Sequence, residues 1–257
     1  MKKYISEKIG GKIFIIRRTH LVTLSLLLAV IAIFYVINHP MVVGRENTEQ
    51  AMPIYSMAQE QKVLALTFNV SSTSDEHTQR VVNALNNEGV HATFFVTGDW
   101  IRENRTLAEQ IVFYGHELMN LSDDHSLLRR LNTQHLRENL ETCSQEIYEV
   151  MGVLPSFFRA PYGEYDTRLV EVANTLGMQA VQWSVDSGDW RGLQADAIVR
   201  QTLNRAFPGG IVLLHSNLPQ TALAMPLLLE QLRITGYEIL PLSQLIYQGE
   251  YVVGVTN

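Results

Sequence analysis

From Lys62 onward, short apolar runs alternate with longer stretches in which apolar residues recur every three or four positions. The runs have the length of buried β-strands, and the stretches have the period of amphipathic helices. The predicted strands are Val63–Phe68, Ala92–Val96, Phe157–Arg159, Ala180–Val185, Ile211–His215 and Tyr237–Leu240. The predicted helices are Thr78–Asn87, Thr106–Tyr114, Gln134–Met151, Thr167–Leu176, Ala195–Ala206 and Ala222–Ile234. This alternation indicates an α/β fold with a parallel sheet covered on both faces, either an open doubly wound sheet or a barrel.

Several predicted helices stop at or just before a glycine. Glycine readily adopts the left-handed conformation that ends many helices. We therefore expect C-terminal caps at Gly89, Gly115, Gly152 and Gly177.

The N-terminal part has a different pattern. An uncharged apolar segment of 17 residues, Leu21–Ile37, reaches the short limit for crossing a hydrocarbon core about 30 Å thick. Residues 1–20 carry a net charge of +5, which by the positive-inside rule predicts a cytoplasmic N-terminus and an extracytoplasmic body. A cleaved signal peptide is the alternative, although no small-residue cleavage site follows closely. We expect a single-pass anchor in the cell membrane.

These patterns divide the chain into five parts. A cytoplasmic basic tail (1–20) and the transmembrane anchor (21–37) come first. Residues 38–61 contain two prolines and neither period, which is typical of a stalk. The folded domain is expected over 62–247, followed by a C-terminal tail at 248–257.

Composition narrows the class of protein. With 46% apolar and 18% charged residues, the chain of 257 residues is neither disordered nor collagen-like. The formal net charge is −6, and the part after residue 20 is more acidic still, which argues against nucleic acid as a partner. Cys143 is the only cysteine, so an intrachain disulfide and a Cys-based zinc cluster are excluded. Its place in the apolar stripe of the helix Gln134–Met151 predicts a core position.

Candidate chemistry gathers where the predicted strands end. Neither G-x-G-x-x-G nor a G-x-x-x-x-G-K-[ST] sequence supports nucleotide binding. In a barrel of parallel strands, active sites lie at the C-terminal ends of the strands. The segments expected there are Thr67–Ser72, His116–His125, Arg159–Gly163, Trp183–Trp190 and Leu213–Ser216.

The order and spacing of these segments resemble the polysaccharide deacetylases of carbohydrate esterase family four, also called the NodB-homology domain. The resemblance covers residues 62–247, and the chain looks most like the membrane-anchored, sporulation-type subgroup. It implies an irregular (β/α) barrel of the polysaccharide-deacetylase type, with a groove for an N- or O-acetylated glycan of the cell wall.

The family mechanism implies a divalent metal, zinc or cobalt, held by one Asp and two His. The metal polarises the acetyl carbonyl and activates a water. A second Asp is the base and a His is the acid.

The metal and base motifs depart from the family pattern. Asn69 and Val70 stand where the family motif T-F-D-D-G has its base and a metal ligand. In the motif H-[ST]-x-x-H, Leu121 replaces the first histidine, and His125 remains as a residual ligand only. The neighbouring Asp123 or Asp124 could supply an oxygen ligand, or the pair is simply a solvated turn. We therefore expect metal binding to be absent or weak.

The groove motifs are retained. Arg159, Pro161 and Tyr162 match R-x-P-Y-G, in which the Arg fixes the base and the Tyr backbone N–H helps to hold the oxyanion. Without an aspartate at position 69, Arg159 must turn to another acceptor. Asp189 and Trp190 match the D-W motif, whose Asp bonds the acid His and whose Trp forms a groove wall. His215 supplies that acid, or is a strand-end histidine held by Asp189 for structural reasons.

Three functions remain open from the sequence. The first is an extracytoplasmic deacetylase that hydrolyses the amide of N-acetylated cell-wall glycan. The second is a degenerate family member that binds this glycan without catalysis, as a scaffold of the envelope or spore. The third is an anchored protein that recruits other proteins during envelope assembly.

Overall fold

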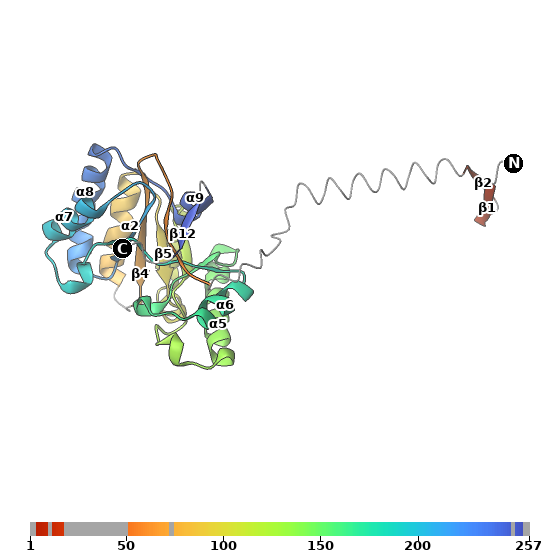
Figure 1. The fold of residues 1–257 in the computed structure, drawn as a ribbon, viewed down its shortest axis with the longest axis horizontal. Coiled ribbons are helices and arrows are strands. Elements are labelled where there is room, and N and C mark those ends of the chain that lie inside the picture. Colours follow the sequence, from red (N-terminus) through yellow and green to blue (C-terminus); the bar gives the residue numbers. More distant parts are fainter. Residues whose placement is uncertain (1–3, 10–11, 18–50, 72–74, 248–249, 254–257) are drawn as a thin grey trace. The chain divides into compact units, whose positions relative to one another are not determined.

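The computed structural model describes residues 4–9, 12–17, 51–71, 75–247 and 250–253 (Figure 1). The chain divides into two compact units, residues 1–49 and 50–257. In the first unit, β1 (Tyr4–Ile9) and β2 (Lys12–Arg17) form an antiparallel pair. The predicted anchor, 21–37, lies outside the described residues. None of the helices within the described ranges is long and apolar enough to cross a membrane.

The second unit is built on one curved sheet in the order β12-β3-β10-β4-β5-β6-β7-β8. β9 also pairs with β10, and β11 with β4. All pairs are parallel except those of β3 and β12, and a bridge between Ile54 and Val181 links β3 to the chain just after β8. The strands are β3 (Ile54–Met57), β4 (Val63–Val70), β5 (Thr93–Val96), β6 (Glu117–Asn120), β7 (Phe157–Phe158), β8 (Gln179–Ala180), β9 (Val185–Asp186), β10 (Gly210–His215), β11 (Glu238–Ile239) and β12 (Tyr251–Val253). The unit is an α/β half-barrel, which confirms the α/β class and the parallel sheet that the repeated strand–helix pattern predicts.

Helices cover the outside of this sheet. Figure 1 shows α2, α7 and α8 packed together beside β4, with α5 and α6 adjacent to each other elsewhere on the sheet. The helices are α2 (Asp75–Asn87), α3 (Gly98–Glu103), α4 (Arg105–Phe113), α5 (Thr133–Met151), α6 (Thr167–Thr175), α7 (Ala195–Arg205), α8 (Pro219–Ile234) and α9 (Leu242–Tyr247). Short 3₁₀ turns are η1 (Leu128–Arg130), η2 (Pro161–Gly163) and η3 (Asp189–Arg191). The four glycines predicted as caps all have positive φ, and Gly152 ends α5 at φ 74°.

The central strand β4 separates two apolar layers. Every residue of β4 is buried, as a strand covered on both faces requires. Leu64, Leu66, Phe68 and Val70 pack in the layer under the helices, whereas Val63 and Ala65 join a second cluster that includes residues of α9. Side chains alternate between the two faces of a strand, so consecutive residues at the C-terminal end of β4 point to opposite faces of the sheet. Cys143 lies in the helix-covered layer, as expected, and burial raises the pKa of its thiol.

The structure corrects three predicted boundaries. Ile54–Met57, expected in the stalk 38–61, forms β3, because its apolar residues are buried between β10 and β12. Tyr251–Val253, expected in the tail 248–257, forms β12 against β3. The predicted strand Ala180–Val185 is two short strands, β8 and β9, because the chain leaves β7 to pair with β10.

Candidate functional site

The predicted site segments meet at the C-terminal ends of the parallel strands. Asn69 on β4 and His215 on β10 are direct partners in the parallel register. Phe158 on β7 pairs with Asn120 of β6, so the next residue, Arg159, leaves the sheet at the same edge. The sheet thus brings together residues up to 146 positions apart in the chain. This edge is where α/β barrels place their chemistry.

Asp189 and His215 form the contact expected of an acid His and its partner. Asp189 Oδ1 lies 2.9 Å from His215 Nδ1. The same carboxylate accepts hydrogen bonds from the backbone N–H groups of Trp190 and His215, at 2.8 and 2.6 Å, and from the Thr221 hydroxyl at 2.8 Å. Its side chain is fully buried, whereas that of His215 is 24% exposed. Nδ1 is therefore engaged with the carboxylate, while the imidazole as a whole remains partly exposed at the strand ends.

Arg159 donates its hydrogen bonds to neutral acceptors, because the sequence has no aspartate at position 69. Its guanidinium is fully buried and donates from Nη1 to Asn69 Oδ1 and from Nη2 to the Gln182 carbonyl, both at 3.1 Å. The Phe95 ring centre lies 4.0 Å from the guanidinium carbon. Its Nε has no hydrogen-bond partner among the described residues. Burial lowers the pKa of Arg159 to about 9, so the group remains a buried cation at neutral pH.

His125 and Tyr162 lie together beside this edge. Their ring centres are 4.7 Å apart, and the His125 N–H donates to Ser122 Oγ at 2.9 Å. Burial lowers the pKa of His125, the charge of His215 lowers it further, and Asp124 opposes the change. The structure therefore places both histidines at one site, with His125 favoured in its neutral form.

Backbone strain concentrates at the same place. Ser122, His125 and Tyr162 have φ values of 83°, 56° and 61°, and they are the only non-glycine residues with positive φ in the described ranges. Such conformations persist where the surroundings fix them, and they cluster at functional sites. Pro161 is buried at the start of η2 and directs the chain into this turn, which leaves Tyr162 62% exposed. A Cβ on the following Gly163 would lie 2.9 Å from the Trp183 ring, so only glycine fits there.

The two positions that carry metal ligands in the family are apolar core here. Val70 and Leu121 are both fully buried, in the helix-covered layer and in the inner cluster respectively. Neither side chain has an atom that could coordinate a cation.

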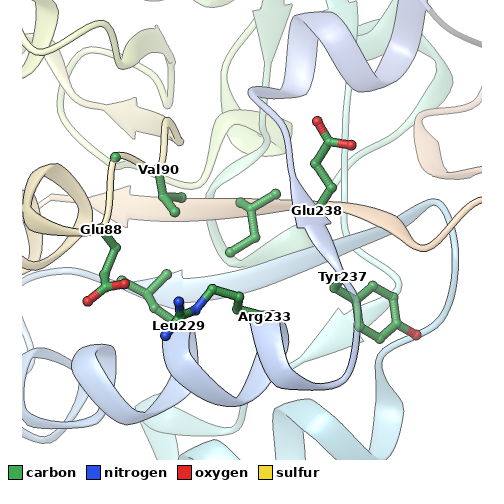
Figure 2. A pocket seen from close by; sticks show the side chains of 8 residues that line it. Glu88, Val90, Leu229, Arg233, Tyr237 and Glu238 are labelled. Atoms are coloured by element: carbon green, nitrogen blue, oxygen red, sulfur yellow. The ribbon is translucent and has the colours of Figure 1, made fainter.

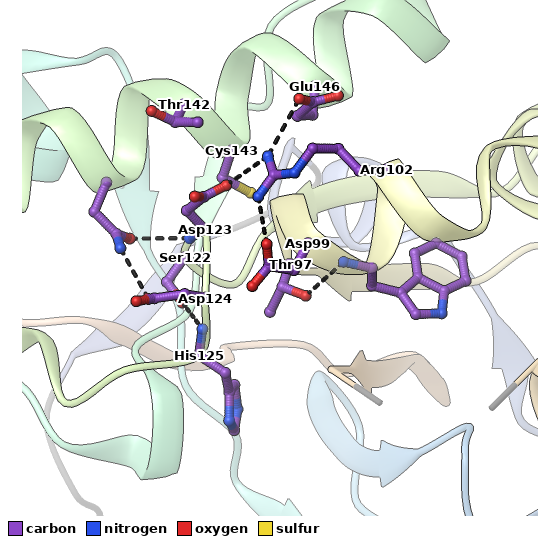
Figure 3. A network of polar contacts seen from close by, with 12 residues as sticks. Thr97, Asp99, Arg102, Ser122, Asp123, Asp124, His125, Thr142, Cys143 and Glu146 are labelled. Carbon is purple, nitrogen blue, oxygen red and sulfur yellow. Dashed lines mark hydrogen bonds and ion pairs between the residues drawn. The ribbon is translucent and has the colours of Figure 1, made fainter. Parts of the chain in front are cut away.

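The nearby aspartates do not replace them (Figure 3). Asp123 Oδ1 accepts a hydrogen bond from Arg102 at 2.9 Å, in a cluster that also contains Asp99 and Glu146. In Figure 3 the imidazole of His125 points away from this cluster. Asp123 and Asp99 in turn raise the pKa of Arg102, against the effect of burial.

Asp124 is engaged elsewhere. Its Oδ1 accepts from Asn139 Nδ2 at 2.9 Å and from the Ser126 N–H at 3.1 Å. Burial alone would raise the pKa of Asp124, but these hydrogen bonds lower it. No group of three or more His, Cys, Asp or Glu side chains among the described residues is arranged to hold a metal ion. The residues present therefore do not fit the divalent metal that the family implies.

The indole of Trp190 contacts a carboxylate that lies outside the family motifs. The indole is 55% exposed, and its Nε1 lies 3.2 and 3.3 Å from the two carboxylate oxygens of Asp186. The Arg191 guanidinium lies 4.7 Å from the centre of the indole. Asp186 stands within the segment Trp183–Trp190, three residues before Asp189, but nothing in its residue type predicts contact with the indole.

A separate cavity lies at the opposite end of β4 (Figure 2). It measures 290 Å³, and its wall includes Glu238 and Ile239 of β11, which pair with the first residues of β4. Figure 2 shows Glu88, Arg233 and Tyr237 around it. None of the motif residues lines this cavity, so it is distinct from the site at the strand ends.

Fold and site together define the class of protein: an α/β half-barrel with an Asp–His pair and a buried Arg at its strand ends. The family profile described as polysaccharide deacetylase matches residues 56–181. A chitooligosaccharide deacetylase of Bradyrhizobium sp. (strain ANU 289) is 34% identical over 183 residues, 65% of this chain and 84% of that protein. The chain belongs to the polysaccharide deacetylase family.

The chain is also similar to other curated proteins and to solved structures. The peptidoglycan-N-acetylglucosamine deacetylase PgdA of Listeria monocytogenes is 31% identical over 76% of this chain. The chain spans 41% of the length of PgdA, and 61% of the uncharacterized protein YlxY of Bacillus subtilis. The crystal structure of a protein from Bacillus anthracis, described as a CE4 family pseudoenzyme, superposes with a TM-score of 0.72 at 28% identity. The superposition covers 76% of this chain and 69% of that protein.

Proposed function

We propose that this protein is a membrane-anchored, extracytoplasmic member of the family that binds N-acetylated cell-wall glycan without hydrolysing it. One observation carries the proposal. At the position of the family's base, the Asn69 amide accepts a hydrogen bond from Arg159. At the positions of two of the family's metal ligands stand fully buried aliphatic side chains, Val70 and Leu121.

The chemistry of amide hydrolysis explains why these positions matter. Attack on an acetamide needs an activated water and compensation for the negative charge that develops on the carbonyl oxygen. A neutral Asn69 amide accepts no proton near neutral pH, so it cannot activate water. His215 with Asp189 could still protonate a leaving amine, but that step follows the attack.

Two exposed aromatic side chains support the proposed binding of a glycan. Tyr162 and Trp190 expose 62% and 55% of their surfaces. Exposed aromatic side chains offer flat apolar faces together with polar edges. Cell-wall glycan is the class of ligand that the names of the relatives suggest, since they include peptidoglycan and chitooligosaccharide deacetylases. The location outside the membrane rests on the sequence alone, on the basic tail and the apolar segment 21–37.

A second candidate function is slow deacetylation with His215 as acid, which the Asp189–His215 contact favours. The full-length protein in detergent micelles should be tested for sedimentation with insoluble peptidoglycan and for acetate release from N-acetylglucosamine oligomers. We expect sedimentation without acetate. Acetate release that scales with protein and is lost in His215→Ala would establish the second candidate instead. Failure to sediment with peptidoglycan would contradict the proposed function.

The location has its own test. We expect the full-length protein in the membrane fraction, with the domain accessible to protease added outside the cell. A soluble form shortened beyond residue 37 would show a cleaved signal peptide instead.

A further inference from the structure

Trp190 combines high exposure with a fixed edge. Its Nε1–H lies within 3.3 Å of both carboxylate oxygens of Asp186, four residues earlier. A hydrogen bond to a charged acceptor is stronger than one to a neutral acceptor. The indole is therefore held by its edge although more than half of its surface is exposed.

Asp186 is itself fixed to the sheet. It is the last residue of β9 and pairs in register with Leu213 of β10, two residues before His215. The Gly188 N–H donates to Asp186 Oδ1 at 2.7 Å, and the Asp186 carbonyl accepts from Gln201 Nε2 at 3.1 Å. These hydrogen bonds fix both the backbone and the carboxylate of Asp186, so the acceptor of the indole N–H has a fixed position.

The guanidinium of Arg191 lies close to both the indole and the Asp186 carboxylate. The Arg191 guanidinium lies 4.7 Å from the indole centre and 3.7 Å from Asp186 Oδ2. A guanidinium over an aromatic ring is attracted to the ring face. Arg191 thus lies over one face of Trp190, and the indole is still 55% exposed, so a ligand can reach the remaining surface of the ring.

We propose that Asp186 is a positioning residue that holds Trp190 with one face presented to a neutral, N-acetylated sugar ring. The inference rests on the proposed function, because it concerns the same glycan surface. Holding the ring in place before binding removes the entropic cost of immobilising that side chain when the sugar arrives. Loss of the contact should weaken glycan binding about fivefold.

The first test needs no glycan. In full-length protein labelled with ¹⁵N-tryptophan, comparison with Trp190→Phe assigns the Trp190 indole N–H signal among the three tryptophans. We expect Asp186→Ala to speed hydrogen exchange of this signal and to shift it. Asp186→Asn, which keeps a neutral acceptor, should give an intermediate result. Asp196→Ala, which removes an exposed carboxylate from an ion pair with Arg200 on α7, is the matched control and should change nothing.

The second test measures binding of an N-acetylglucosamine tetramer by calorimetry. Asp186→Ala should weaken binding about fivefold in the wild-type background. In the Trp190→Phe background, which lacks the indole N–H, it should have almost no further effect. Equal weakening in both backgrounds would show that Asp186 acts by another route and would overturn the inference.

The two tests separate this inference from the proposed function. An unchanged indole signal in Asp186→Ala overturns the positioning role whatever the glycan does. If the indole signal responds but the wild-type protein binds no glycan, the proposed function fails, and with it the assignment of a sugar ring to the open face of Trp190. Thermal melting of each variant identifies any that fails to fold, and Asp186→Asn then replaces Asp186→Ala in both tests.

Discussion

The buried guanidinium of Arg159 makes Asn69→Asp an informative change. Arg159 is fully buried, and its hydrogen-bond acceptors are the Asn69 amide and the Gln182 carbonyl, both neutral. Burial lowers the pKa of Arg159 well below its usual range, to about 9. At roughly 1.4 kcal/mol per pH unit, keeping the cation inside the fold costs about 5 kcal/mol.

A carboxylate at position 69 would offset part of this cost. Asn69 Oδ1 lies 3.1 Å from Arg159 Nη1, and two unit charges about 4 Å apart attract by about 4 kcal/mol at an effective dielectric constant of about 20. Desolvation of the new carboxylate cancels much of that attraction. We expect Asn69→Asp to raise the free energy of unfolding by about 1–2 kcal/mol at pH 7.

The gain has a defined pH dependence. The neighbouring cation depresses the pKa of the introduced carboxyl group in the folded state below its unfolded value of about 3.9. The gain is therefore fully present above the unfolded pKa and is lost as the pH falls through the folded pKa.

Urea unfolding of the full-length protein at pH 7 and pH 3 measures both quantities. The exposed position Asn204 on α7 provides the control variant Asn204→Asp, which should change stability by less than about 0.5 kcal/mol. A loss of stability in Asn69→Asp at pH 7 would refute the reasoning, because Arg159 would then gain nothing from a negative partner.

Three further predictions follow from buried groups and a close backbone contact. The combined change Asn69→Asp, Val70→Asp and Leu121→His should release acetate from N-acetylglucosamine oligomers in the presence of zinc, and the unmodified protein should release none; equal release from both would contradict the site assignment. Without metal this variant should unfold more readily by about 1–3 kcal/mol, and zinc should restore part of that loss in thermal melts. Burial, reinforced by the charge of His91, lowers the pKa of His116 from 6.5 to about 4, so stability should fall by about 3 kcal/mol as the pH drops from 6.5 to 4; His116→Gln should flatten that profile in urea titrations. Gly209→Ala should prevent stable folding, detectable as loss of a cooperative melt, because a Cβ there would lie 2.0 Å from the carbonyl oxygen of Met57 at the end of β3.

The sequence predicted the main fold because hydrophobic periodicity reports burial directly. β4 and α5 are recognisable from their apolar patterns, and both are present. β3 was missed because four residues after a proline carry too little periodicity to distinguish a strand from a stalk. Its burial depends on β10 and β12, which lie about 150 or more positions away in the chain.

The candidate site was predictable only in part, for a related reason. The resemblance to the family predicted the Asp189–His215 contact and the need of Arg159 for a new acceptor. It could not identify Gln182, which acts through its backbone carbonyl, since any residue type could supply that atom. Nor could it identify Thr221, which reaches Asp189 from α8.

Asp189 accepts four hydrogen bonds, so its carboxylate has a structural role beside its contact with His215. This carboxylate joins η3, β10 and α8, and its removal would leave buried backbone and hydroxyl donors without an acceptor. Asp189 therefore stabilises the fold whether or not the chain catalyses a reaction. An intact Asp–His pair in a sequence of this fold therefore does not by itself indicate catalytic activity, because the same contacts hold three elements together.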